Sequence, residues 1–226
     1  MIQSGRAFPY DVQIALCGYG ETKDETTMSL LDAVRESPCK ITVRYLTGDA
    51  LIGRSRSIVC TRFLEENLAP YMVFIDTDIA FTPLEMVRLI QALQEGYDII
   101  GGACGLSSGN NLNIKAIDYN TKIDGGIYEV QYIGCAFLGI SRNALLTIKD
   151  KLTLPLLHKD SYLRCYPFFE SGRYMPELLY ISEDWDFCNK ARQAGFKIYL
   201  HTGVLVDHIK SHTIRCEDVI AKKNRH

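Results

Sequence analysis

The sequence lacks any apolar run close to the ~20 residues that a membrane-spanning helix requires. Its first residues, MIQSGRAFPYD, also lack the apolar core of a secretory signal. The formal net charge is −2, so the chain has none of the basic excess that nucleic-acid-binding domains carry. We therefore expect a protein with no integral membrane segment and no nucleic-acid partner, located in the cytoplasm, or in the host cytoplasm if a virus encodes it.

No two of the eight cysteines form a CxxC pair, and the sequence shows no internal repeat, low-complexity tract or clean linker. Several cysteines lie in apolar segments, as Cys17 does in VQIALCG and Cys135 in YIGCAFLGI. Buried thiols of this kind behave as small hydrophobic side chains. The pattern argues against a disulfide framework or a cysteine zinc cluster, and it favours a reducing compartment.

What the sequence does contain is an alternation of apolar strands and helical patterns. In the first hundred residues the order is β-α-β-α-β-α-β, with strands expected at 12–16, 41–46 and 71–75 and in YDIIGGACG. The segments MVFI and YDII are continuously apolar, as in strands covered on both faces. The sequence predicts an α/β fold with a mostly parallel central sheet, whose ligands bind beyond the carboxyl ends of the strands.

Helices are expected between these strands. Met28, Leu31 and Val34 repeat every three residues in TTMSLLDAV. Thr82 and Glu85 have the spacing of a capping box at the start of FTPLEMVRLIQALQEG. The buried side of this last helix is expected to consist of Leu84, Val87, Ile90 and Leu93.

The second half is less regular. One or two strands are expected in YEVQYIGCAFLGISR, and one or two more in FKIYLHTGVLVDHIKSH. Between them, ISEDWDFCNKARQAG predicts a short helix that begins near Ser182 and ends at Gly195. The polar segment LSSGNNLNIKAIDYNTKIDGG is rich in turn-forming residues.

Two acids directly follow the apolar segment MVFI in the sequence IDTDIA. Carboxylates beside a buried apolar run are costly unless a cation meets them. Asp76 and Asp78 follow a predicted parallel strand and precede a capped helix, and their hard oxygen ligands suit Mg²⁺ or Mn²⁺. Taken alone, the two acids would be interpreted as a turn at the end of a strand, and it is their context that favours a metal site.

Three elements in order resemble the GT-A class of nucleotide-sugar glycosyltransferases, close to the family 2 type. IDTD resembles the DxD motif, and SEDWDF resembles an acidic motif at a helix start, ED-x-D-F. His208 resembles a C-terminal histidine that completes the metal site in many members. A fourth segment, IGRSRSIVC, is similar to the arginine-bearing helix start before the DxD strand. The match spans residues 12–212.

The resemblance implies a GT-A fold with a small acceptor-side lobe, in one domain over residues 1–226. Residues 10–104 would form the nucleotide-sugar-binding half and 105–212 the acceptor and catalytic half, followed by a tail at 213–226. It also implies the activity. A sugar would be transferred from a nucleoside diphosphate sugar, UDP favoured and GDP next, to a hydroxyl of a glycan or glycoprotein, with inversion.

The resemblance also assigns the metal site. Asp78 would bind Mn²⁺ or Mg²⁺ directly, and Asp76 would contact the ribose, or the metal through water. His208 would be the second protein ligand, although a hydrogen-bonded histidine at a strand end explains it equally well. His201 and His212 match this position less well.

For the acidic motif at the helix start, the resemblance implies that Asp184 is the general base and that Glu183 holds the acceptor. The alternative is that both acids only satisfy a helix N-terminus. Trp185 and Phe187 are expected to anchor the core, and Asp186 to cap or bridge internally.

The donor-binding residues implied by the resemblance lie in the first half. Arg54 would reach the nucleotide or its phosphates, and Asp49 would accept from the base or ribose. For Arg56 we expect a solvated position instead. Gly18 and Tyr19 would approach the base, with Tyr19 stacking on it.

Two further features extend the expected site. Gly101 and Gly102 would permit a close backbone approach to the donor sugar. The aromatic segment 162–174 is expected either to bind the acceptor or, with more support, to form a small second core.

Two other classes remain open. A sugar-nucleotide nucleotidyltransferase also uses paired acids and Mg²⁺ on a related sheet. CGYGETKDE, however, has one lysine among acids where that class has a basic, glycine-rich loop. The other class is a non-catalytic nucleotide- or carbohydrate-binding domain that kept the fold.

Overall fold

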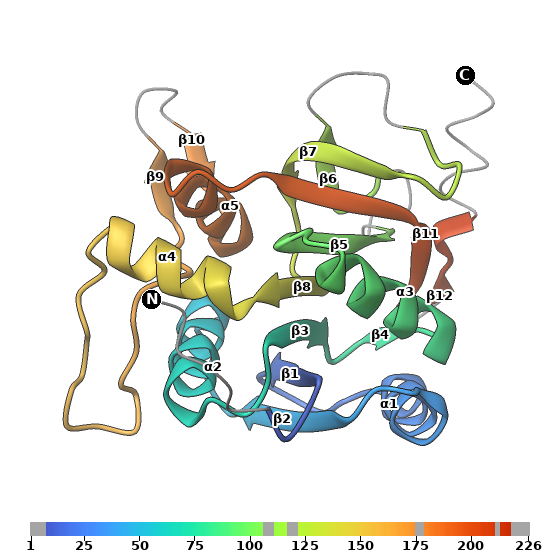
Figure 1. The fold of residues 1–226 in the computed structure, drawn as a ribbon, viewed down its shortest axis with the longest axis horizontal. Coiled ribbons are helices and arrows are strands. Elements are labelled where there is room, and N and C mark those ends of the chain that lie inside the picture. Colours follow the sequence, from blue (N-terminus) through green and yellow to red (C-terminus); the bar gives the residue numbers. More distant parts are fainter. Residues whose placement is uncertain (1–7, 106–110, 117–121, 175–178, 211–212, 218–226) are drawn as a thin grey trace.

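The computed structural model describes residues 8–105, 111–116, 122–174, 179–210 and 213–217 (Figure 1). The helices are α1 (Asp24–Glu36), α2 (Ile52–Glu66), α3 (Pro83–Gln94), α4 (Arg142–Lys151) and α5 (Glu183–Gln193). The strands are β1 (Val12–Gly18), β2 (Ile41–Thr47), β3 (Tyr71–Asp76), β4 (Ile79–Ala80), β5 (Ile99–Cys104), β6 (Ile114–Ala116), β7 (Ile127–Ile133), β8 (Phe137–Ser141), β9 (Gly172–Tyr174), β10 (Leu179–Ile181), β11 (Ile198–Ile209) and β12 (Thr213–Ile214).

The main sheet of the described residues has the order β2-β1-β3-β8-β5-β11-β7-β6, and β4 and β12 pair with β11. The predicted α/β alternation of the first hundred residues is confirmed. The sheet itself is mixed. The pairs β1–β2, β1–β3 and β5–β11 are parallel, whereas β8 lies antiparallel between β3 and β5. Because β7 is antiparallel to β11 and β8 is antiparallel to β5, these two consecutive strands run in the same direction, and the short loop Gly134–Ala136 joins them across the sheet.

Helices cover both faces of this sheet, which explains its continuously apolar strands (Figure 1). One core lies under α2, α4 and α5 and contains Phe63, Phe74 and Phe187. The other lies under α3 and contains Met86 and Leu89. Alternate residues of β1 enter the two cores, so this strand is buried along its whole length.

The capping box of α3 is present, with Thr82 N donating to Glu85 Oε2 at 2.7 Å. The buried side predicted for this helix was partly wrong. Ile90 and Leu93 are buried, but Leu84 is exposed, and Met86 and Leu89 complete the buried side.

Helix α1 forms where it was predicted, but the three apolar residues of its predicted repeat face outward. Met28, Leu31 and Val34 are exposed, whereas the small residues Thr26, Ser29 and Ala33 are buried. The small side chains allow a close approach to the turn after β3. Thr26 Oγ1 donates to Thr77 O at 3.2 Å, and Ser29 Oγ accepts from Phe81 N at 3.0 Å.

In the second half, YEVQYIGCAFLGISR forms the two strands β7 and β8, and α5 forms where SEDWDF predicted it. Part of LSSGNNLNIKAIDYNTKIDGG lies outside the described residues. The expectation of a small second core for the aromatic segment 162–174 was wrong. Phe168 and Phe169 belong to the main core, where Phe169 stacks on Phe187 with ring centroids 4.6 Å apart. No helix in the described part of the chain is long and apolar enough to cross a membrane.

Candidate active site

The two acids after β3 lie beside the end of β11. Asp76 ends β3, and the short strand β4 pairs antiparallel with β11, so that Ile79 lies opposite His208. Ile209 N donates to Asp78 O at 2.7 Å, which fixes the turn against β11. As a result, His208 Nε2 lies 3.1 Å from Asp78 Oδ2, although the two residues are 130 positions apart.

The imidazole of His208 is held on both sides. Its Nδ1 lies 3.0 Å from Gly105 O, a carbonyl that can only accept, so Nδ1 carries a proton. Nε2 also faces a carboxylate, and this contact is the main reason that the pKa of His208 is raised. Burial opposes the charge on Asp78, but the hydrogen bonds from His208 and Lys210 lower the pKa of Asp78 to about 2.

A third group, Lys210, completes this cluster. Its Nζ lies 2.5 Å from Asp78 Oδ2, the oxygen that His208 also contacts. When His208 is neutral and its proton is on Nδ1, donated to Gly105 O, the Nε2 lone pair is available to a metal ion beside Asp78. Among the described residues, no third acid, cysteine or histidine completes a metal-binding group. The described residues thus offer a carboxylate oxygen of Asp78 and an imidazole nitrogen of His208, two ligand types that a divalent cation accepts.

Arg56 connects the two acidic motifs. Its Nη2 donates to Asp76 Oδ1 at 2.7 Å and its Nη1 to Glu183 Oε1 at 2.5 Å, and its side chain is only 5% exposed. The expectation of a solvated Arg56 was wrong. Helix α2 presents this side chain inward, because Gly53 brings α2 against α5. A Cβ on Gly53 would lie 3.1 Å from the Glu183 side chain and 3.0 Å from Phe169 O.

At the start of α5, Asp184 has one occupied and one open carboxylate oxygen. Oδ1 accepts from Ser182 Oγ and from Trp185 N. No described residue donates to Oδ2, and a Cβ on Gly134 would lie 3.3 Å from it. Glycine at position 134 therefore keeps the space before this carboxylate free.

The loop that carries Gly134 also contacts the end of β3, because Asp76 N donates to Ala136 O at 3.1 Å. The structure thus brings Asp76, Asp78, His208, Glu183 and Asp184 into one region. They lie at the ends of strands β3 and β11 and at the N-terminus of α5, on both sides of the Gly134–Ala136 loop.

The other residues of the α5 motif behave as anchors. Phe187 is fully buried, and Trp185 stacks on Tyr132 with the ring centroids 4.4 Å apart. Asp186 bridges internally, as expected, with Lys190 Nζ at 2.7 Å and Glu170 N at 3.0 Å. Burial is the main cause of the raised pKa of Asp186.

Four residues predicted to contact the donor lie at the end of β1 or near the start of α2. Gly18 lies against the acidic turn, since a Cβ there would be 2.6 Å from Thr77 Cγ2. The ring of Tyr19 is 73% exposed. Asp49 and Arg54 form a two-pronged pair, with both nitrogen–oxygen distances 2.7 Å, and the hydrogen bond from Arg54 lowers the pKa of Asp49. Asp49 and Arg54 line a cavity of about 120 Å³ that Tyr162 also lines.

The glycines of β5 have a packing role, which corrects the expectation that they face the donor sugar. A Cβ on Gly101 would lie 2.6 Å from Ile133 Cδ1, and one on Gly102 would lie 2.6 Å from Val204 Cγ1. Both residues are buried in the sheet. Of the lesser histidine candidates, His201 accepts from Gly203 N through Nδ1 at 3.1 Å, and His212 lies outside the described residues.

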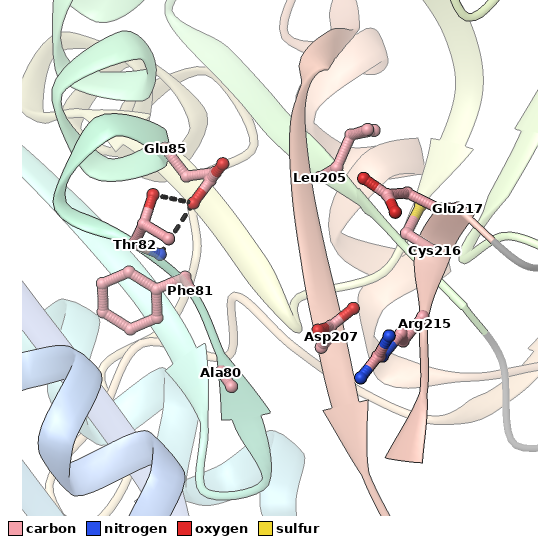
Figure 2. A pocket seen from close by; sticks show the side chains of 9 residues that line it. All are labelled: Ala80, Phe81, Thr82, Glu85, Leu205, Asp207, Arg215, Cys216 and Glu217. Atoms are coloured by element: carbon pink, nitrogen blue, oxygen red, sulfur yellow. Dashed lines mark hydrogen bonds between the residues drawn. The ribbon is translucent and has the colours of Figure 1, made fainter.

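A larger cavity of about 400 Å³ lies elsewhere, between β4, α3 and the end of β11 (Figure 2). Its walls carry Glu85, Asp207, Glu217 and Arg215. Neighbouring residues of a strand face opposite sides, so Asp207 points into this cavity and His208 points away from it, toward Asp78. The cavity is therefore separate from the paired acids.

Sequence reasoning missed three residues of the site: Arg56 as an internal cation, Lys210, and Gly134. The signal for Arg56 was its place in the arginine-bearing helix start, IGRSRSIVC. The signal for Lys210 was its position two residues after His208, on the same side of an extended segment.

Solved structures resemble this fold at low sequence identity. The structure described as A197 from STIV matches with a TM-score of 0.60 and 18% identity, over 88% of this chain and 86% of that chain. The structure of GalNAc-T7 with UDP, GalNAc and Mn²⁺ matches with a TM-score of 0.56 and 10% identity, over 89% of this chain. The match spans only 43% of the GalNAc-T7 chain.

No protein-family model and no curated protein sequence matches the chain. At these identities the structural matches establish the fold alone. Together with the mixed sheet and its helical layers, they show that the chain has an α/β fold of the GT-A type.

Proposed function

We propose that the chain is a metal-dependent glycosyltransferase. It would transfer a sugar from a nucleoside diphosphate sugar, with UDP favoured and GDP next, to a hydroxyl of a glycan or glycoprotein. Residues 10–104 would bind the donor, and residues 105–212 would supply the acceptor side and the catalytic base. The similarity to GalNAc-T7, whose structure contains UDP, GalNAc and Mn²⁺, supports a nucleotide-sugar donor and a metal ion.

One observation carries the proposal. Asp78 and His208 meet at 3.1 Å at the ends of β3 and β11. Arg56 joins the same turn to the start of α5, where the open carboxylate oxygen of Asp184 lies. A cation-binding pair and a free carboxylate, held on opposite sides of one loop, are the two parts that metal-assisted transfer to a hydroxyl needs.

The mechanism assigns each group one task. Asp78 and His208 would hold Mn²⁺ or Mg²⁺, which when bound stabilises negative charge on the leaving diphosphate. Asp76 would contact the ribose or the metal through water, while Arg56 holds its carboxylate in place. Tyr19 would stack on the base, and Asp49 and Arg54 would contact the nucleotide.

Asp184 would act as the base of an inverting reaction. Its Oδ2 would accept the proton of the acceptor hydroxyl as that oxygen attacks the anomeric carbon. Ser182 Oγ and Trp185 N orient the carboxylate by binding Oδ1. Glu183 already accepts from Arg56, so in this mechanism it positions the helix start and contacts the acceptor.

The experiment is a product analysis with UDP- and GDP-sugars, Mn²⁺ and a panel of glycan acceptors. We expect release of the nucleoside diphosphate, its loss in Asp78→Ala, and a fall of about 100-fold or more in transfer in Asp184→Asn, with nucleotide binding kept. Asp32→Asn, on the exposed side of α1, is the control for the loss of one carboxylate.

The same assay separates the two other classes. Pyrophosphate as product would identify a nucleotidyltransferase instead. Nucleotide binding without turnover of any sugar would identify a binding domain. Full activity of Asp78→Ala would refute the metal assignment, and normal transfer by Asp184→Asn would move the base elsewhere.

A further inference from the structure

The ammonium group of Lys210 occupies the position where a metal ion would neutralise Asp78. Lys210 Nζ lies 2.5 Å from Asp78 Oδ2, and His208 Nε2 approaches the same oxygen at 3.1 Å. A divalent cation that binds this oxygen is expected to displace the ammonium, because a doubly charged ion and an ammonium in contact with one oxygen repel each other strongly. Lysine therefore competes with the metal in the free protein.

The surroundings of Lys210 allow it to move. It directly follows β11, its side chain is 35% exposed, and its single charge sits on a flexible four-carbon stem. Among the described residues, Asp78 is the only acid with which it forms an ion pair. Once Asp78 is taken by a metal, the ammonium has no internal partner there and remains beside the acidic turn.

We propose that Lys210 is an exchangeable counter-ion of the donor site. It neutralises Asp78 while the site is empty, and it moves to the diphosphate of the donor when the metal takes Asp78. The inference rests on the proposed function, since it requires a metal and a diphosphate at this turn. It makes Lys210 a donor-binding residue that weakens metal binding in the absence of nucleotide.

A salt bridge with a purely structural role would behave differently. Its loss would leave the affinity for Mn²⁺ unchanged or lower and would not affect nucleotide binding once Mn²⁺ is saturating. Exchange predicts that loss of the Lys210 charge changes the two affinities in opposite directions. The same charge competes with the metal and attracts the diphosphate.

The test uses Lys210→Gln, with Lys210→Arg to keep the charge. Lys197→Gln is the matched control, because Lys197 is an exposed lysine paired with Glu129 and its loss changes the net charge equally. Mn²⁺ affinity is measured without nucleotide by electron paramagnetic resonance of free Mn²⁺ at constant pH. The affinity for UDP, or for GDP if the wild type prefers it, is measured by calorimetry at saturating Mn²⁺.

For Lys210→Gln we expect Mn²⁺ to bind about tenfold more tightly and the nucleotide about tenfold more weakly, each corresponding to the loss of one partly exposed charge contact. Lys210→Arg and Lys197→Gln should stay within about threefold of the wild type. Unchanged or weaker Mn²⁺ binding, or affinities that change in the same direction, would overturn the inference.

Failure of the inference can be told apart from failure of the proposed function. If the wild type transfers sugar with Mn²⁺ but Lys210→Gln leaves the Mn²⁺ affinity unchanged, only the inference is wrong. If the two affinities shift in opposite directions but no nucleotide sugar is turned over, the exchange stands and the transferase proposal fails. If neither protein binds Mn²⁺, with or without nucleotide, both are wrong.

Discussion

Replacing Arg56 by methionine should destabilise the protein strongly. The guanidinium is almost fully buried and donates to two carboxylates, Asp76 at 2.7 Å and Glu183 at 2.5 Å. Methionine keeps most of the apolar packing but leaves both carboxylates without their cation. Removing one partner of a buried ion pair costs ~3–5 kcal/mol. Asp76 and Glu183 are 34% and 15% exposed, so water can solvate them in part, and we expect the lower end, about 3 kcal/mol.

The assay is urea denaturation followed by tryptophan fluorescence, since Trp185 is the single tryptophan and lies in the same helix as Glu183. The midpoint temperature should also fall by about 6–12 °C, as expected for a domain of this size. Arg54→Met is the matched control. It removes the same group two residues earlier in α2, where the pair with Asp49 is more exposed, and it should cost less than about 1 kcal/mol.

A second variant tests whether unpaired charge is the cause. The double variant Arg56→Met, Glu183→Gln removes one of the two carboxylates that Arg56→Met leaves unpaired. It should therefore be more stable than Arg56→Met alone. Equal stability of Arg56→Met and Arg54→Met would refute the reasoning, because the argument depends on the difference in burial between the two arginines.

Three further predictions follow from the site. Gly18→Ala should cost about 1–3 kcal/mol in denaturation, because its Cβ would lie 2.6 Å from Thr77 Cγ2, whereas Gly20→Ala, with no atom within 4 Å, should be neutral. Tyr19→Ala should leave stability unchanged, since the ring is 73% exposed, and should weaken UDP binding about 5- to 100-fold in calorimetry if the ring stacks on the base. The raised pKa of His208 means that the folded state keeps a proton that the unfolded state has lost, so metal-free stability should fall as the pH rises above about 6.5 through the folded pKa. His208→Gln should remove this part of the slope, by ~1.4 kcal/mol for each unit of pKa shift, and an unchanged slope would contradict the assignment.

The sequence was sufficient to predict those elements that depend on residues close together in the chain. Thr82 and Glu85 mark the start of α3 because a capping box involves residues three apart, and the box forms as expected. Asp76 and Asp78 are placed at a strand end by the apolar run before them. The meeting of Asp78 with His208 was predicted by resemblance, and the structure supplies its physical cause, the pairing of β4 with β11.

Long-range packing decided the points where sequence reasoning was wrong. The spacing of Met28, Leu31 and Val34 correctly predicts a helix, but α1 turns its small residues inward because the turn at Thr77 leaves little room. The glycines of β5 suggest an open approach to a ligand, whereas Ile133 and Val204 fill the space that they leave.

The two acids of DTD look equivalent in the sequence, but in the structure they pair with different cations. Asp76 is bound by Arg56, a buried guanidinium near the start of α2, and breaking this ion pair would leave a charge unpaired in the core. Asp78 is bound by Lys210, a partly exposed ammonium just after β11, and breaking this ion pair costs little because water can solvate the ammonium. Only Asp78 can therefore exchange its partner at low cost. This asymmetry, which follows from the burial of the two cations, favours Asp78 over Asp76 as the direct metal ligand.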